Sequence, residues 1–225
     1  MLVNVPYFLF ALLLLWFPRQ WMRLGFLVGG RRGKRHGQGK EPWKTHEAGA
    51  MKVSLRSEFA KVRNYVDFLR GGAGSLALLG GLDIVPSLGV AENAGGSVVL
   101  VALAVKLGIL LVGLIMQTLR FEKRRFLYFA PIFYICGISI GLCGLKGALF
   151  AFVMMWTVNA MIMGPQGFLS VYALLILVFG QLFGGVGNKL TIVAALYCFL
   201  PVLLSLLSQR PLVLFTRKGV RPQGA

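Results

Sequence analysis

The distribution of positive charge is the sequence feature that most limits how this chain can fold. All but three of its 24 Lys and Arg residues lie in three blocks, at 19–70, 120–125 and 210–221. Long apolar stretches with almost no charge separate these blocks. Cytoplasmic loops of multi-pass membrane proteins collect Lys and Arg in this way, whereas a soluble protein spreads them over its whole surface. The pattern therefore predicts an all-α, multi-pass membrane protein.

The composition leads to the same prediction. Hydrophobic residues make up 57% of the chain and its mean hydropathy is +0.75, well above an average globular domain. Several uncharged runs reach about 18 residues, which is long enough for a membrane-spanning helix. A net charge of +17 would suggest nucleic acid as the partner of a soluble protein. In a membrane protein we interpret it as facing the anionic headgroups of the cytoplasmic leaflet, and we expect no nucleic-acid partner.

We predict about seven membrane-spanning helices. The first, at residues 3–17, has no basic segment before it and no cleavage site after it, so we expect an uncleaved helix with its N-terminus outside. The other six are predicted at 72–90, 97–119, 126–145, 147–163, 167–184 and 190–208. Seven crossings place all three basic blocks in the cytoplasm and leave Lys146 and Lys189 at the outer interface. The predicted span at 72–90 contains many glycines, so it is either a full span or a re-entrant element.

This organisation divides the chain into four parts. They are a first helix at 1–18, a basic cytoplasmic loop at 19–70, a six-helix membrane domain at 71–208 and a basic cytoplasmic tail at 209–225. Apolar residues at intervals of three and four predict a basic amphipathic helix over 51–70. We expect this helix to lie along the headgroup plane, with docking on another cytoplasmic protein as the alternative. The side chains assigned to anionic lipid or a partner are Arg31, Arg32, Lys34, Arg35, Lys52, Arg56, Lys61 and Arg63.

Asp83 and Lys106 are the acidic and basic residues that lie deep inside predicted spans. A charge at such depth costs at least about 2.5 kcal/mol, so it normally has a partner or a function. The short connection at 91–96 makes the two spans an antiparallel hairpin. At 1.5 Å rise per residue both charges then lie about 10–14 Å below the outer interface. We therefore predict an intramembrane pair, which either fixes the helix register or relays protons or ions.

Small residues recur at helical spacing at Gly137, Gly141, Gly144 and Ala148, in and just beyond the predicted span 126–145. Such a stripe lets another helix backbone approach closely, either within the chain or from a partner chain. The three cysteines lie in apolar segments without metal-ligand spacing, and both histidines fall in the basic loop. We therefore predict no metal site and no cofactor.

The sequence is compatible with three functions, and we favour the first. This is a non-catalytic subunit in the inner cell membrane that scaffolds or anchors an assembly of other membrane proteins, because no catalytic motif is present. The second is a small-solute or ion transporter that uses Asp83 and Lys106. The third is a lipid-modifying enzyme whose reactive groups lie beside the headgroups in the basic loop. Its candidate residues are His36, Glu41, His46 and Glu47.

Overall fold

The chain is almost entirely helical over the residues that the computed structural model describes, which are 5–17, 53, 58–79, 96–122, 125–162, 164–185, 187–210 and 212–213. The helices are α1 (Val5–Trp16), α4 (Val62–Leu79), α6 (Gly96–Thr118), α7 (Ile132–Cys143), α8 (Leu145–Val158), α9 (Gly164–Gly184) and α10 (Lys189–Leu207). A 3-10 turn, η2 (Asn159–Met161), follows α8. Three short strands are β1 (Leu119–Glu122), β2 (Arg125–Phe129) and β3 (Leu212–Val213).

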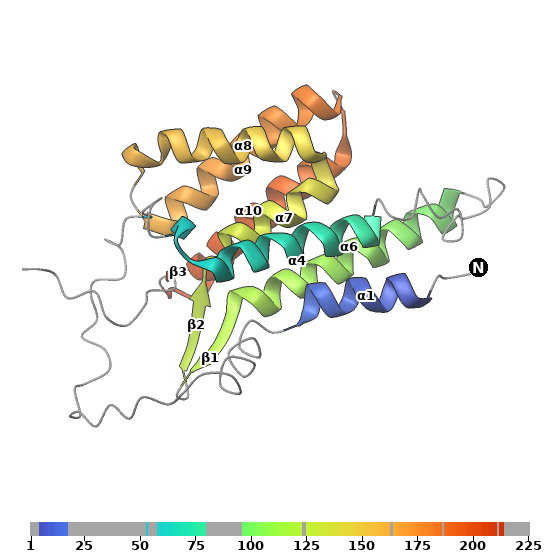
Figure 1. Cartoon of the computed structure of the whole chain (residues 1–225), viewed down its shortest axis with the longest axis horizontal. Coiled ribbons are helices and arrows are strands. Elements are labelled where there is room, and N and C mark those ends of the chain that lie inside the picture. Colours follow the sequence, from blue (N-terminus) through green and yellow to red (C-terminus); the bar gives the residue numbers. More distant parts are fainter. Residues whose placement is uncertain are drawn as a thin grey trace, which may run out of the picture.

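The α7 helix lies at the centre of the bundle. Every residue of α7 except Gly141 is buried. The helices α4, α8, α9 and α10 pack around it, and α1 packs against α4 and α6 (Figure 1). In a bilayer an apolar helix can also contact lipid, so the hydrophobicity of α7 does not by itself place it at the centre. Small residues let its neighbours approach: a Cβ on Gly137 would lie 2.5 Å from the backbone nitrogen of Gly72 in α4.

Consecutive helices from α7 to α10 run in opposite directions. In the α8 and α9 pair, the ring of Phe152 packs edge to face against Tyr172, and that of Trp156 packs edge to face against Phe168, so the two helices are antiparallel. Gln166 near the start of α9 donates to Ser205 near the end of α10, so these two are also antiparallel. This alternation brings the ends of the helices to two opposite sides of the bundle (Figure 1).

The segment before α7 is a strand and not the start of a helix. β1 and β2 form an antiparallel hairpin that pairs Leu119 with Tyr128, and β3 runs parallel to β2. The prediction of a helix beginning at residue 126 is therefore wrong over 126–129. Pro131 disfavours the α conformation in the residue before it, and the backbone of β2 finds its hydrogen-bond partners in β1 and β3 instead. The helix then begins after Pro131.

The helix predicted over 51–70 is interrupted at Ala60 and Lys61, and its last part, residues 62–70, is joined in the structure to the predicted second span. α4 continues through Gly71 and Gly72, where the sequence suggested a boundary. Glycine inside a helix costs about 1 kcal/mol relative to alanine. Here it lets the backbone of α7 approach, since a Cβ on Gly71 would lie 3.2 Å from the backbone nitrogen of Ile138. Residues 80–90, the rest of the predicted second span, lie outside the described part of the chain.

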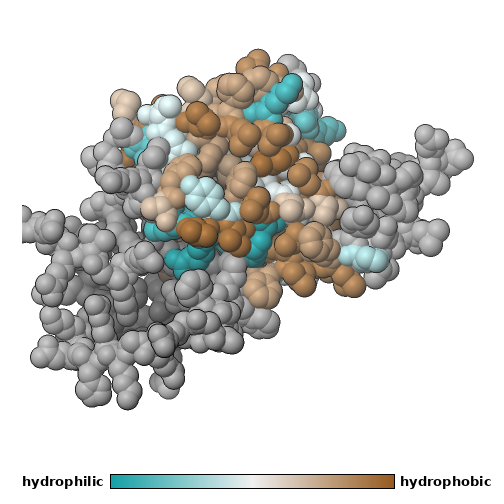
Figure 2. Space-filling model, in the orientation of Figure 1, coloured by the Kyte–Doolittle hydropathy of each residue, from teal (hydrophilic) through white to brown (hydrophobic). Residues whose placement is uncertain are grey.

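The outer surface of the bundle is largely apolar. Figure 2 shows hydrophobic residues over most of the described face, and large apolar side chains are exposed on α1, α4, α6, α8, α9 and α10. Three helices are long and apolar enough to cross a membrane, at Leu100–Thr118, Gly164–Gly184 and Lys189–Leu207. In water an apolar surface of this extent would mark an aggregation liability or a docking site, whereas in a bilayer it contacts acyl chains.

Candidate functional site

The α4 helix turns its polar residues toward the inside of the bundle. Asn64, Asp67 and Arg70 are at most 6% exposed, whereas Val62 and Leu69 are 76% and 63% exposed. A surface helix of a soluble protein has the opposite arrangement, with its apolar stripe inside. The inverted pattern is expected when the outward face meets lipid, because charged groups must then find partners within the protein. The apolar stripe predicted from the sequence thus faces away from the bundle over 62–69.

Arg70 of α4 binds the carboxyl end of α1. Its Nε donates to the carbonyl oxygen of Leu14 at 3.0 Å, and its Nη2 donates to the carbonyl oxygen of Phe17. Its Nη1 donates to Oδ1 of Asp67 at 3.3 Å, which forms a buried ion pair one helical turn away. The guanidinium also lies 6.0 Å from the ring centroid of Phe17 and 5.9 Å from that of Tyr134, within cation–π range.

Two further side chains bind the same end of α1. The Tyr134 hydroxyl of α7 donates to the carbonyl oxygen of Leu15 at 2.8 Å. Gln117 of α6 donates to the carbonyl oxygen of Phe17 at 3.1 Å. We call Asp67, Arg70, Gln117 and Tyr134 the α1 cap cluster. Its members come from three helices and meet only where these helices cross α1.

The chemistry of the α1 cap cluster is that of a helix cap. The last carbonyls of a helix have no partner within the helix, and an unsatisfied one in an apolar environment costs several kcal/mol. A cation at this end also interacts favourably with the helix dipole. The donors of Arg70, Gln117 and Tyr134 point at α1 carbonyls, so the cluster attaches α1 to the bundle.

A second polar cluster lies just before α4. The Glu58 carboxylate accepts from Lys61 at 2.5 Å and from the Asn64 amide at 2.8 Å. Beside it, the Phe59 ring packs on Phe133 and Trp156 with centroids 5.3 and 5.2 Å apart. These contacts fasten the segment before α4 onto α7 and α8.

The structure places the predicted lipid-binding and charge-pair residues as follows. Lys61 forms an ion pair with Glu58. The Arg63 side chain is half-buried. Lys106 is half-buried on α6, and Asp83 lies outside the described residues. The proposed pairing of Asp83 with Lys106 therefore stays a prediction. Also outside the described residues are Arg31, Arg32, Lys34, Arg35, Lys52 and Arg56.

The predicted small-residue stripe divides between two helices. A Cβ on Gly137 would lie 2.5 Å from the backbone nitrogen of Gly72, and one on Gly141 would lie 2.6 Å from the Ser75 hydroxyl. Both glycines thus face α4 of the same chain. Gly144 has φ +83° and separates α7 from α8, and Ala148 is fully buried on α8.

Sequence reasoning missed the α1 cap cluster, although part of its signal was present. Asp67 and Arg70 stand three residues apart, outside the apolar stripe of the predicted amphipathic helix. Their i,i+3 spacing permits an ion pair. No local pattern links them to Gln117 or Tyr134, which lie far along the chain.

These features define the class of the chain. Within its described residues it is a helical protein with a lipid-compatible surface, an inverted amphipathic helix and three helices able to cross a membrane. Comparison with protein-family models, with curated proteins and with solved structures gave no match.

Proposed function

We propose that this chain is a non-catalytic subunit of the inner cell membrane that scaffolds or anchors a larger membrane assembly. The observation that carries the proposal is the α1 cap cluster. In this cluster the buried Asp67–Arg70 pair and the Tyr134 hydroxyl hold α4 and α7 to the end of α1. A site for chemistry needs side chains whose donors and acceptors are directed at a substrate, and here they are directed at the backbone of α1.

We further propose that the chain crosses the membrane seven times. The alternation of α7, α8, α9 and α10 supports this topology. α7 and α8 contain 12 and 14 residues, and so are about 18 and 21 Å long. They are shorter than the hydrocarbon core of about 30 Å. Short helices of this kind are accommodated by local thinning of the bilayer or by association with other proteins. Association with other proteins is what a scaffold subunit would do.

The orientation in the proposal follows from charge. Lys61 and Arg63 stand at the start of α4, and Arg210 stands after α10. Lys146 and Lys189 begin α8 and α10, at the opposite side of the bundle. The side of the bundle with Lys61, Arg63 and Arg210 has more basic residues than the side with Lys146 and Lys189. We therefore assign it to the cytoplasm. The N-terminus is then outside and the C-terminus is cytoplasmic.

Cysteine labelling tests this orientation. In intact cells, a membrane-impermeant maleimide is expected to label Lys189→Cys and not Gln209→Cys, because the two positions lie at opposite ends of α10. Permeabilised cells should show labelling of both. The three native cysteines are buried, so the unsubstituted chain is the control for background. Labelling of Gln209→Cys from outside would reverse the topology.

Purification tests the subunit function. The full chain, tagged at its C-terminus and extracted in mild detergent, is expected to retain at least one other membrane protein at constant ratio through affinity and size-exclusion steps. In a harsh detergent that leaves the chain folded, the other protein should be lost from the tagged chain. A chain that elutes alone from the mild detergent, at the mass of its own monomer or homo-oligomer, would rule out the scaffold role.

A further inference from the structure

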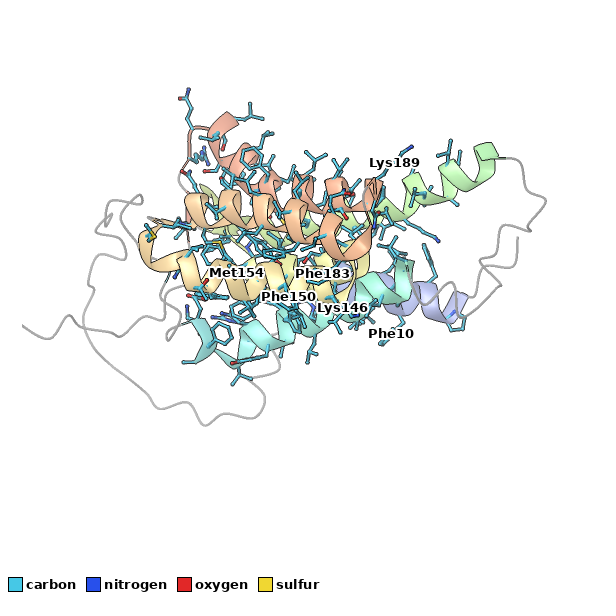
Figure 3. All side chains as sticks on the ribbon, turned by 90° about the horizontal axis from the view of Figure 1, so that it is seen from above. Phe10, Lys146, Phe150, Met154, Phe183 and Lys189 are labelled. Carbon is cyan, nitrogen blue, oxygen red and sulfur yellow. The ribbon has the colours of Figure 1, made fainter. Side chains whose placement is uncertain are left out.

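The α8 helix exposes a line of side chains that has one charge at its end. Lys146, Phe150 and Met154 are four residues apart and so lie on one face, and Figure 3 shows them in a row along the helix. Phe150 is 53% and Met154 39% exposed, and the Lys146 side chain is exposed as well. From Lys146 to Met154 the line is about 12 Å long at 1.5 Å per residue. This length is close to one leaflet of the hydrocarbon core, about 15 Å.

Three phenylalanine rings widen this line into a flat apolar surface shared with α9. Phe150 stacks on Phe183 with centroids 4.9 Å apart and planes 29° apart. Phe179 stacks on Phe183 at 6.3 Å and 17°. The three rings are therefore nearly parallel, and mutual packing restricts their rotamers. Phe150 and Phe183 lie toward the end of α8 that carries Lys146 (Figure 3). We call Lys146, Phe150, Met154, Phe179 and Phe183 the α8–α9 surface.

We propose that the α8–α9 surface binds one anionic phospholipid, with the phosphate at the Lys146 ammonium and the acyl chains along the phenylalanine rings. The surface has a cation at headgroup depth and a rigid apolar strip beneath it, which matches an amphiphile with an anionic end. Among the residues whose side chains the structure describes, the carboxylates are Glu58 and Asp67, which bind Lys61 and Arg70. An anionic headgroup at this surface would supply a counter-charge to the Lys146 ammonium. The site lies at the side of the bundle opposite Lys61, Arg63 and Arg210. The proposal requires that the chain is embedded in a bilayer, but it does not require a partner subunit.

A fluorophore within the surface gives a site-specific test. The full chain with Met154→Cys, labelled with a fluorophore, is reconstituted in phosphatidylcholine vesicles that contain spin-labelled phosphatidylglycerol or spin-labelled phosphatidylcholine. Phosphatidylglycerol is expected to quench at about fivefold lower concentration, because one Lys near an anionic surface contributes about 1 kcal/mol. The added substitution Lys146→Gln should bring this ratio to about one. The matched control Lys189→Gln removes the exposed lysine of α10, which lies apart from the rings, and should leave the ratio unchanged.

Three outcomes would overturn the proposal. Equal quenching by the two lipids in the unsubstituted background would show that the surface contacts lipid without charge recognition. An unchanged ratio in Lys146→Gln would assign the preference to other basic residues. Absence of quenching by either lipid would show that protein covers the surface, such as a second copy of the chain. None of these results bears on the scaffold function, which the purification experiment tests separately.

Discussion

Replacing Arg70 with methionine is expected to lower the free energy of unfolding by about 3–5 kcal/mol. This is the usual cost of removing one member of a buried ion pair. The substitution leaves the Asp67 carboxylate buried without its cation, and it removes the Arg70 donors from the carbonyls of Leu14 and Phe17. The measurement is thermal or denaturant unfolding of the purified chain in a single detergent, followed by circular dichroism.

The double variant separates charge from capping. Asp67→Leu with Arg70→Met removes both charges, so it should recover part of the lost stability. It should not recover all of it, because the Leu14 carbonyl still lacks its donor. Lys189→Met, at an exposed position, is the control and should be nearly neutral. If Arg70→Met were as stable as this control, the α1 cap cluster would not hold α1.

Replacing Gly137 with alanine is expected to destabilise the bundle by about 3 kcal/mol, at the upper end of the usual range for overpacking. The new Cβ would clash with the carbonyl oxygen of Phe68 and would lie 2.5 Å from the backbone nitrogen of Gly72. Both are backbone atoms of α4, so α4 and α7 must separate to admit the methyl group. The same unfolding measurement gives the change.

The matched control for this substitution is Gly108→Ala on α6. Nothing lies within 4 Å of a Cβ at Gly108. The alanine there should be neutral or stabilise by up to about 1 kcal/mol through helix propensity. Equal effects at the two positions would mean that α4 and α7 are not in close backbone contact.

The long apolar helices were the part of the fold that the sequence predicted best. The predicted spans 97–119, 167–184 and 190–208 correspond to α6, α9 and α10 within a few residues at each end. Long uncharged runs can satisfy their backbone in lipid only as helices. Glycine and charged residues at their ends then mark the boundaries.

The strands and the α1 cap cluster were not predicted, for two different reasons. The aromatic run at 125–129 is apolar enough to continue a span, and only its pairing with β1 and β3 makes it a strand. The cluster depends on where α4, α6 and α7 cross α1, which periodicity does not report. The sequence predicts that the basic side chains of the amphipathic helix lie at the lipid headgroups, whereas Arg70 lies inside the bundle, where it has Asp67 as its partner.

The central place of α7 has a consequence for how the protein is made. On the proposed topology, α7 leaves the ribosome before α8, α9 and α10, and so before most of the neighbours that enclose it. A helix of 12 residues is about 18 Å long, shorter than the hydrocarbon core of about 30 Å. Only Gly144 separates it from α8. On that topology we expect α7 and α8 to enter the membrane together as one hairpin and to pack against α4, which is synthesised earlier.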